Sequence, residues 1–309
     1  MKREKLIYKS HNGEHNVTAW LIYNEDIAIK GIVQVAHGMK EHFLRYSEFT
    51  EFLANSGYAV CGNDHVGHGD SLCGEQGSMG YGDVCETIVN DMHALFKIVK
   101  GRFPKAPYYL LGHSLGGFAS MVYASGWAYE LNGLILSGVG DYSLVQLIMY
   151  KCLYWVCNIA IALFGPNKKI ALIDSLFFGS FLKYFKPIKT KADWQNSDEN
   201  MRNIFLADPK VDFYFPLGGY KGVMRAIETV SSKKWAKSLP KTLPVLIFSG
   251  GDDPVVYFGK GAKLLCNRLI EAGVNDVSLS LYEGGRHEML FETDREEVYR
   301  DIAGWLNNR

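Results

Sequence analysis

The sequence has no net charge and lacks the features that would point to a nucleic acid, a metal or a disulfide framework. Its 33 Lys and Arg balance its 33 Asp and Glu, so no global positive charge favours nucleic-acid binding. The six cysteines are spread singly, without the spacing of a zinc site or of a disulfide-stapled fold. We therefore expect a reduced, cytoplasmic protein with free thiols, no metal and no other cofactor.

Long apolar runs are also scarce. The first ten residues are largely charged and lack an apolar core of signal-peptide length, and the chain shows no internal repeat and no low-complexity segment. One run, residues 144–164, has Lys151 as its only charged residue. Its length would allow a membrane span. However, it interrupts a regular pattern and has no partner span, so we interpret it as part of a lid of amphipathic helices.

The regular pattern is an alternation of strands and helices. Strands are predicted as three segments within residues 4–36 and then at 58–62, 108–111, 133–137, 243–249 and 276–282. Helices are predicted at residues 45–56, 83–101, 118–127, 259–272 and 295–306. This alternation predicts a mostly parallel, eight-stranded sheet with helices on both faces. In such sheets functional groups gather at the carboxyl ends of the strands.

The alternation stops in the middle of the chain. We expect an α/β core made of residues 1–141 and 240–309, with residues 142–239 inserted as a helical cap. Residues 142–241 hold 15 Lys and Arg but only 7 Asp and Glu, and they are rich in Leu and Phe. Such a basic, apolar cap suits peripheral docking on an anionic membrane, here the inner surface of the cell membrane. The alternative, that the apolar residues pack on the core and the lysines are solvated, is equally compatible with the sequence.

A serine lies on a tight turn between a predicted strand and a predicted helix, in Gly112-His113-Ser114-Leu115-Gly116-Gly117. Glycines at such a turn let the chain fold back closely, and the serine hydroxyl is held above the sheet edge at the positive end of the helix. The G-x-S-x-G pattern in this context is typical of a nucleophilic serine.

A serine hydroxyl needs a base to remove its proton and an acid to orient that base. His287, in a glycine-rich loop after the last strand, is the best candidate for the base. Asp253, just past another strand end and fixed by the proline that follows, is preferred as the acid over its neighbour Asp252 and over Asp141. The order Ser114, Asp253, His287 is the triad order of α/β-hydrolases.

The remaining groups of the site come from loops. The oxyanion needs two backbone N–H donors, which we expect from Leu115 and Met39. We expect His113 to be structural, because neighbours on a sharp turn point apart. We expect hydrogen bonds from four further histidines to hold the loops, namely His37, His42, His65 and His68.

Five motifs in this order resemble those of the monoacylglycerol lipase and lysophospholipase branch of the α/β-hydrolases, relatives of the S33 serine aminopeptidases. They are His37-Gly38-Met39-Lys40-Glu41-His42-x-x-Arg45-Tyr46, Asp64-x-x-Gly67-His68-Gly69-x-Ser71, the serine turn, Gly250-Gly251-Asp252-Asp253-Pro254-Val255 and Gly284-Gly285-Arg286-His287-Glu288. The resemblance implies the α/β-hydrolase fold and supports the same triad and oxyanion donors. It also implies that Glu41 and Arg45 lie near the alcohol end of the substrate, although a loop-stabilising ion pair explains these two residues equally well.

These observations predict a serine hydrolase that cleaves carboxylic esters of lipid-like alcohols through an acyl-enzyme. Two alternatives use the same fold. An aminopeptidase-type enzyme would cut amides and would need an acidic anchor for the substrate amine, which the positive charge of the cap does not favour. A non-catalytic, ligand-binding member of the fold would have no need for an intact set of triad candidates.

Overall fold

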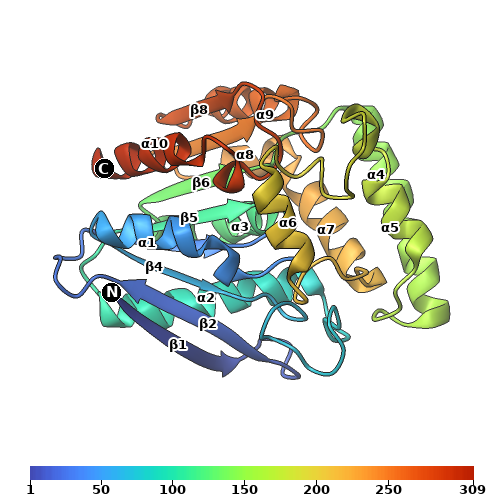
Figure 1. Ribbon diagram of the computed structural model, residues 1–309, viewed down its shortest axis with the longest axis horizontal. Helices are drawn as coiled ribbons and strands as arrows, with labels where there is room; N and C mark the ends of the chain where they lie inside the picture. The colour runs from blue at the N-terminus through green and yellow to red at the C-terminus, as the bar shows by residue number, and fades with distance from the viewer.

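The computed structural model describes all 309 residues and contains one eight-stranded sheet in the order β1-β2-β4-β3-β5-β6-β7-β8 (Figure 1). Its strands are β1 (Lys2–Lys9), β2 (Asn16–Tyr23), β3 (Gly31–Ala36), β4 (Tyr58–Asn63), β5 (Tyr108–His113), β6 (Gly133–Ser137), β7 (Val245–Gly250) and β8 (Val277–Tyr282). The strands from β3 to β8 run parallel, whereas β1 pairs antiparallel with β2 and β2 antiparallel with β4. The prediction of a mostly parallel sheet is confirmed.

Burial along the strands explains why the sequence forms this sheet. Every residue of β3, β4, β5, β6 and β7 is buried, as expected for strands covered on both faces. Exposure alternates residue by residue along the edge strand β1. Its outward positions include Arg3, Lys5 and Lys9, and charged side chains on an edge strand disfavour pairing with another chain.

Helices cover both faces of the sheet, as predicted. On one face lie α1 (Ser47–Asn55) and α10 (Arg295–Asn307), which share a cluster of 25 buried apolar residues with the strands. On the other face lie α2 (Val84–Arg102), α3 (Leu115–Trp127) and α9 (Lys260–Glu271), within a cluster of 52 buried residues. Four short 3-10 helices, at Phe43–Tyr46, Ala128–Glu130, Leu182–Tyr184 and Met289–Phe291, complete the loops.

The chain between β6 and β7 forms helices and no strand of the sheet. These helices are α4 (Leu144–Phe164), α5 (Ala171–Phe178), α6 (Glu199–Ala207), α7 (Leu217–Val230) and α8 (Lys233–Ser238). We refer to residues 142–239 as the cap. Helix α7 packs against α2 and α3 of the core, and α4 packs on the outer side of α7. The cap therefore lies over the edge of the sheet where the parallel strands end (Figure 1).

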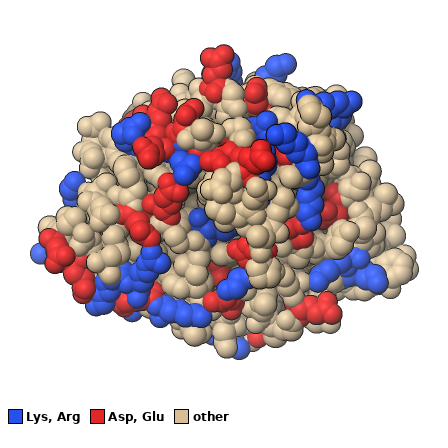
Figure 2. Space-filling model, viewed as in Figure 1, with Lys and Arg blue, Asp and Glu red and all other residues tan.

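The outer face of α4 is apolar and exposed. The helix has a mean hydropathy of 1.8 over an 18-residue window, of which only 6% is buried. By length and composition it could cross a membrane, but one such helix is weak evidence of a span. Apolar side chains of α5 are exposed beside it, and uncharged atoms predominate along this edge of the molecule (Figure 2). The cap therefore exposes many apolar side chains of α4 and α5 to the solvent.

Candidate catalytic site

Ser114 occupies a strained turn between β5 and α3. Its backbone angles are φ 51° and ψ −115°, a region that non-glycine residues rarely adopt. A Cβ atom at Gly112 would lie 2.4 Å from the carbonyl oxygen of Gly116, and one at Gly116 would lie 2.1 Å from that of Ala36. Only glycine fits at these two positions, which explains the G-x-S-x-G spacing. The amide of Ser114 donates to the carbonyl oxygen of Ser137 on β6 at 2.9 Å.

His287 and Asp253 meet although they come from different strand ends. The imidazole Nδ1 of His287 lies 2.9 Å from Oδ2 of Asp253, and both side chains are buried. The Asp253 carboxylate also accepts from the amide of Val255 at 2.8 Å and from the hydroxyl of Ser249 at 3.4 Å. Burial alone would lower the pKa of His287, but the adjoining carboxylate outweighs it and leaves this pKa raised.

The two competing carboxylates lie elsewhere. Asp252 is exposed, and its side chain forms no hydrogen bond or ion pair. Asp141 pairs with Arg268 at 3.1 Å and accepts from the amide of Tyr142 at 3.0 Å. Asp253 is therefore the carboxylate that contacts Nδ1 of His287.

One cavity of about 240 Å³ joins the other predicted residues. Ser114, His287, Met39 and Leu115 all line it. The amide of Met39 forms no hydrogen bond within the protein. The amide of Leu115 is the first of α3, where a helix leaves its N–H groups without intrahelical acceptors. Two backbone donors are thus available next to the serine.

The other histidines contact loops or neighbouring rings. Nε2 of His37 accepts from the amide of His65 at 2.9 Å, and Nε2 of His65 lies 3.1 Å from the carbonyl oxygen of His37, which ties the loops after β3 and β4 together. His42 reaches Asp208 of the cap at 2.8 Å. The expectation that these histidines hold loops is confirmed. His113 packs beside His287 with ring centroids 4.7 Å apart.

Glu41 and Arg45 belong to a buried cluster with Glu288, the residue after the candidate base. The Arg45 guanidinium lies 2.5 Å from Glu41 and 3.0 Å from each carboxylate oxygen of Glu288. Glu41 also accepts from the amide of Gly38 at 2.5 Å and from the hydroxyl of Tyr46 at 2.9 Å. Glu41 and Glu288 line the cavity, whereas Arg45 lies behind them. The ion pair that the sequence allowed is therefore present, with a second carboxylate added.

The cap supplies the wall that sequence reasoning missed. Phe177, Phe178 and Trp194 form an apolar side of the cavity. Two lysines also line it, and each is paired: Lys40 lies 2.5 Å from Asp174, and Lys191 pairs with Asp212. Nothing in the cap sequence marked Phe177, Phe178, Trp194 or Lys191, because they follow no motif, whereas Lys40 belongs to the motif after β3. Glu288 was part of the motif around His287, but no role was predicted for it.

The chain is similar to several known proteins. The monoglyceride lipase of Rattus norvegicus is 29% identical over 289 residues, covering 91% of this chain and 83% of that protein. The monoacylglycerol lipase of Mycolicibacterium smegmatis is 25% identical over 288 residues, covering 92% and 91%. The crystal structure of a thermostable carboxyl esterase from Bacillus coagulans, in complex with glycerol, superposes with a TM-score of 0.93 at 29% identity and covers 100% of this chain and 99% of that one.

The family described as serine aminopeptidase, S33, matches residues 27–294, which include every residue of the site described above. Together with the sheet order, the serine turn and the His287–Asp253 contact, this match shows that the chain has the α/β-hydrolase fold and belongs to the serine aminopeptidase S33 family.

Proposed function

We propose that the protein is a serine hydrolase that cleaves carboxylic esters of lipid-like alcohols. The observation that carries this proposal is the strained Ser114 at the start of α3, in the same cavity as a histidine hydrogen-bonded to a buried aspartate. In this assignment Ser114 is the nucleophile, His287 the general base and Asp253 the orienting acid. The similarity to monoglyceride lipases and to an esterase supports esters as the substrates.

The geometry suggests how each group acts. Ser114 attacks the acyl carbon while His287 takes the hydroxyl proton through Nε2, since Nδ1 is held by Asp253. The amides of Met39 and Leu115 stabilise the oxyanion, and each such donor is typically worth about 2.7–4 kcal/mol of barrier. His287 then protonates the leaving alcohol. It next activates a water that releases the fatty acid and frees the serine.

Replacing the nucleophile tests the assignment directly. Ser114→Ala should reduce the hydrolysis of p-nitrophenyl esters by at least about 10⁴-fold, while circular dichroism and the melting temperature stay close to wild type. A fluorophosphonate probe should label the wild-type protein at Ser114 and leave the variant unlabelled. Turnover retained by the variant would contradict the assignment of Ser114 as the nucleophile. Failure of the probe to label the wild type would favour a non-catalytic, ligand-binding protein.

The pH profile tests the acid. The base acts only when His287 is neutral, so kcat/KM should fall as the pH drops through the raised pKa of His287. Asp253→Asn removes the charge that raises this pKa and leaves the burial that lowers it. This acid limb should therefore move to lower pH, and kcat should drop by about 10⁴-fold. Asp252→Asn, a change at the exposed neighbour, is the matched control and should keep the wild-type profile. An equal effect of both changes would contradict the role of Asp253.

The polar end of the cavity suggests the kind of alcohol that is released. Glu41 and Glu288 face the cavity, and the guanidinium between them is already engaged by both. The lysines that line the cavity are paired as well. A phosphate would thus meet two carboxylates and no free cation, whereas the hydroxyl groups of a neutral polyol can donate to carboxylate oxygens.

Monoacylglycerols should accordingly be hydrolysed with a kcat/KM at least about tenfold above that of lysophospholipids with the same acyl chain, since one good charge-assisted contact is worth about 1.5–3 kcal/mol. A panel of both lipids, short p-nitrophenyl esters and an alanine p-nitroanilide would measure this ranking. A preference for the lysophospholipid would refute the head-group argument. Preferential cleavage of the anilide would instead support the aminopeptidase alternative.

We also propose that the cap acts as a lid and docks on membranes, which would give a cytoplasmic protein access to lipid esters. The exposed apolar faces of α4 and α5 and the excess of basic residues in the cap support this proposal. Ile159 and Leu163, 63% and 70% exposed on α4, are suited to a test because neither lines the cavity.

Sedimentation with vesicles containing anionic lipid should recover the wild-type protein in the pellet, and less of it at high salt. The double change Ile159→Glu and Leu163→Glu should abolish this binding and leave hydrolysis of a soluble short ester unchanged. Ile7→Glu on the remote strand β1, at a residue that is 65% exposed, is the matched control and should bind like wild type. Equal binding by all three proteins would rule out docking through α4.

A further inference from the structure

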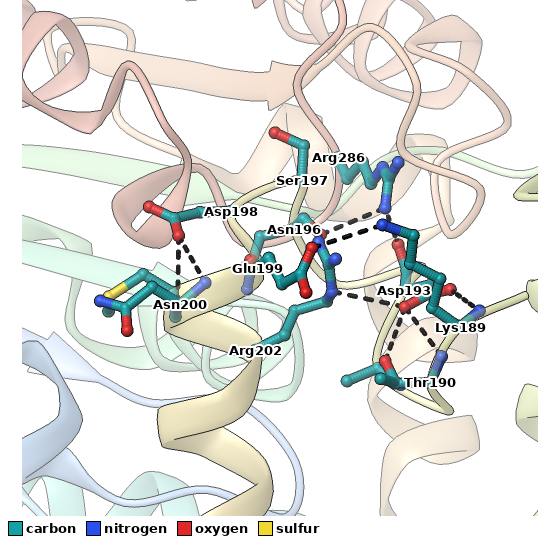
Figure 3. A network of polar contacts seen from close by, with 12 residues as sticks. Lys189, Thr190, Asp193, Asn196, Ser197, Asp198, Glu199, Asn200, Arg202 and Arg286 are labelled. Atoms are coloured by element: carbon teal, nitrogen blue, oxygen red, sulfur yellow. Dashed lines mark hydrogen bonds and ion pairs between the residues drawn. The ribbon is translucent and has the colours of Figure 1, made fainter.

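One segment of the cap holds the loop that carries the candidate base (Figure 3). We call residues 193–197 the clamp segment and residues 286–288 the histidine loop. Arg286 donates to the carbonyl oxygens of Asp193 and, at 3.2 Å, of Asn196. The amide of Glu288 donates to the carbonyl oxygen of Gln195 at 2.6 Å, and the Asn196 side chain donates to Glu288 at 3.1 Å. Both neighbours of His287 are thus hydrogen-bonded to the cap.

The cap also contacts the imidazole ring of His287 directly, through Trp194. The ring of Trp194 lies 5.2 Å from that of His287, with 35° between the planes, and His113 lies on the imidazole at 4.7 Å. Trp194 is 9% exposed and is itself packed against Phe178 and Phe181, at 5.7 and 5.2 Å. A fixed aromatic ring therefore limits how far the imidazole can tilt, and its π face favours the positive charge that the base acquires.

Contacts within the cap also hold the clamp segment in place. The Asp193 carboxylate accepts from the amides of Lys189 and Thr190, at 2.7 and 3.1 Å, and from the Thr190 hydroxyl at 2.6 Å. It also lies 3.3 Å from the guanidinium of Arg202 on α6 (Figure 3). These bonds keep the clamp segment in one conformation, with its carbonyl groups directed at the histidine loop.

We propose that Trp194 is a positioning residue for His287, so that the cap helps to align the base as well as covering the substrate. The proposal rests on the proposed function, in which His287 must keep Nδ1 on Asp253 while Nε2 serves Ser114. A displacement of about 1 Å at such a group can cost about 10²-fold in rate. Loss of the Trp194 ring would leave a void next to the imidazole and permit such a displacement.

The competing explanation is that Trp194, which also lines the cavity, only contacts the acyl chain. A short substrate such as p-nitrophenyl acetate makes little use of that wall, so a wall residue would alter KM for long-chain esters and leave kcat for the acetate unchanged. Arg286 provides a second, independent variant, because it holds the clamp segment without lining the cavity.

The experiment compares Trp194→Ala, Trp194→Phe and Arg286→Met with wild type. We expect Trp194→Ala to lower kcat for p-nitrophenyl acetate about 10- to 100-fold with KM within about twofold, and Trp194→Phe to restore most of the rate. The low-field proton NMR signal of the His287–Asp253 hydrogen bond should broaden or disappear in Trp194→Ala and Arg286→Met and return in Trp194→Phe. Phe213→Ala is the matched control. Phe213 is a half-buried cap aromatic that packs on His68 instead, and its loss should leave both readouts unchanged.

The proposal is overturned if Trp194→Ala keeps the wild-type kcat and the wild-type NMR signal, or if only KM for long-chain esters changes. It is also overturned if Trp194→Ala does not fold and the folded Arg286→Met keeps both readouts. The NMR signal reports on His287 without any substrate. A wild-type protein that shows the signal but hydrolyses no ester would therefore contradict the proposed function and leave the positioning contact testable.

Discussion

The buried guanidinium of Arg45 is the contact on which the geometry of the site depends. It bridges Glu41, on the loop that carries one candidate oxyanion donor, and Glu288, on the loop that carries the candidate base. Its faces are covered by Phe205 of the cap and Phe291 of the core, at 4.6 and 4.3 Å. A buried charge that loses one partner typically costs about 3–5 kcal/mol. The loops after β3 and β8 are therefore held in register by two buried ion pairs that share one guanidinium.

Packing of the sheet around Ser114 offsets the energetic cost of its strained backbone angles. A non-glycine residue held at this kind of backbone angle costs about 1–3 kcal/mol. On either side of the turn Leu111 and Phe118 are buried, and each such side chain contributes about 1.5–3 kcal/mol. The bond from the Ser114 amide to β6 fixes the turn further. Packing therefore outweighs the strain, and the hydroxyl stays in a position that an unstrained turn would not give.

The sequence was informative where a feature is local. Strands of apolar residues, glycine turns and the rule that strand ends share one edge were enough to place Ser114, Asp253 and His287 together. Helix α3 begins at Leu115, whereas the sequence predicted a start at residue 118. Its first turn contains Gly116 and Gly117, which allow close backbone approach but show no apolar helical periodicity. The contacts of the clamp segment could not be predicted, because they join it to the histidine loop, which lies about 90 residues further along the chain. No pattern in the cap encodes that approach.

The two sides of the cap differ in their polar contacts with the core. Of the side chains of α5, Asp174 alone forms an ion pair with the core, through Lys40. The clamp segment is joined to the core by several hydrogen bonds. Among them, the amide of Ser197 donates to both carboxylate oxygens of Glu292 at 3.0 Å. Displacing α5 therefore breaks one charged contact, whereas displacing the segment beside His287 breaks many. Phe178 of α5 packs on Trp194 at 5.7 Å, so the two sides of the cap are coupled through the ring that we propose to position His287.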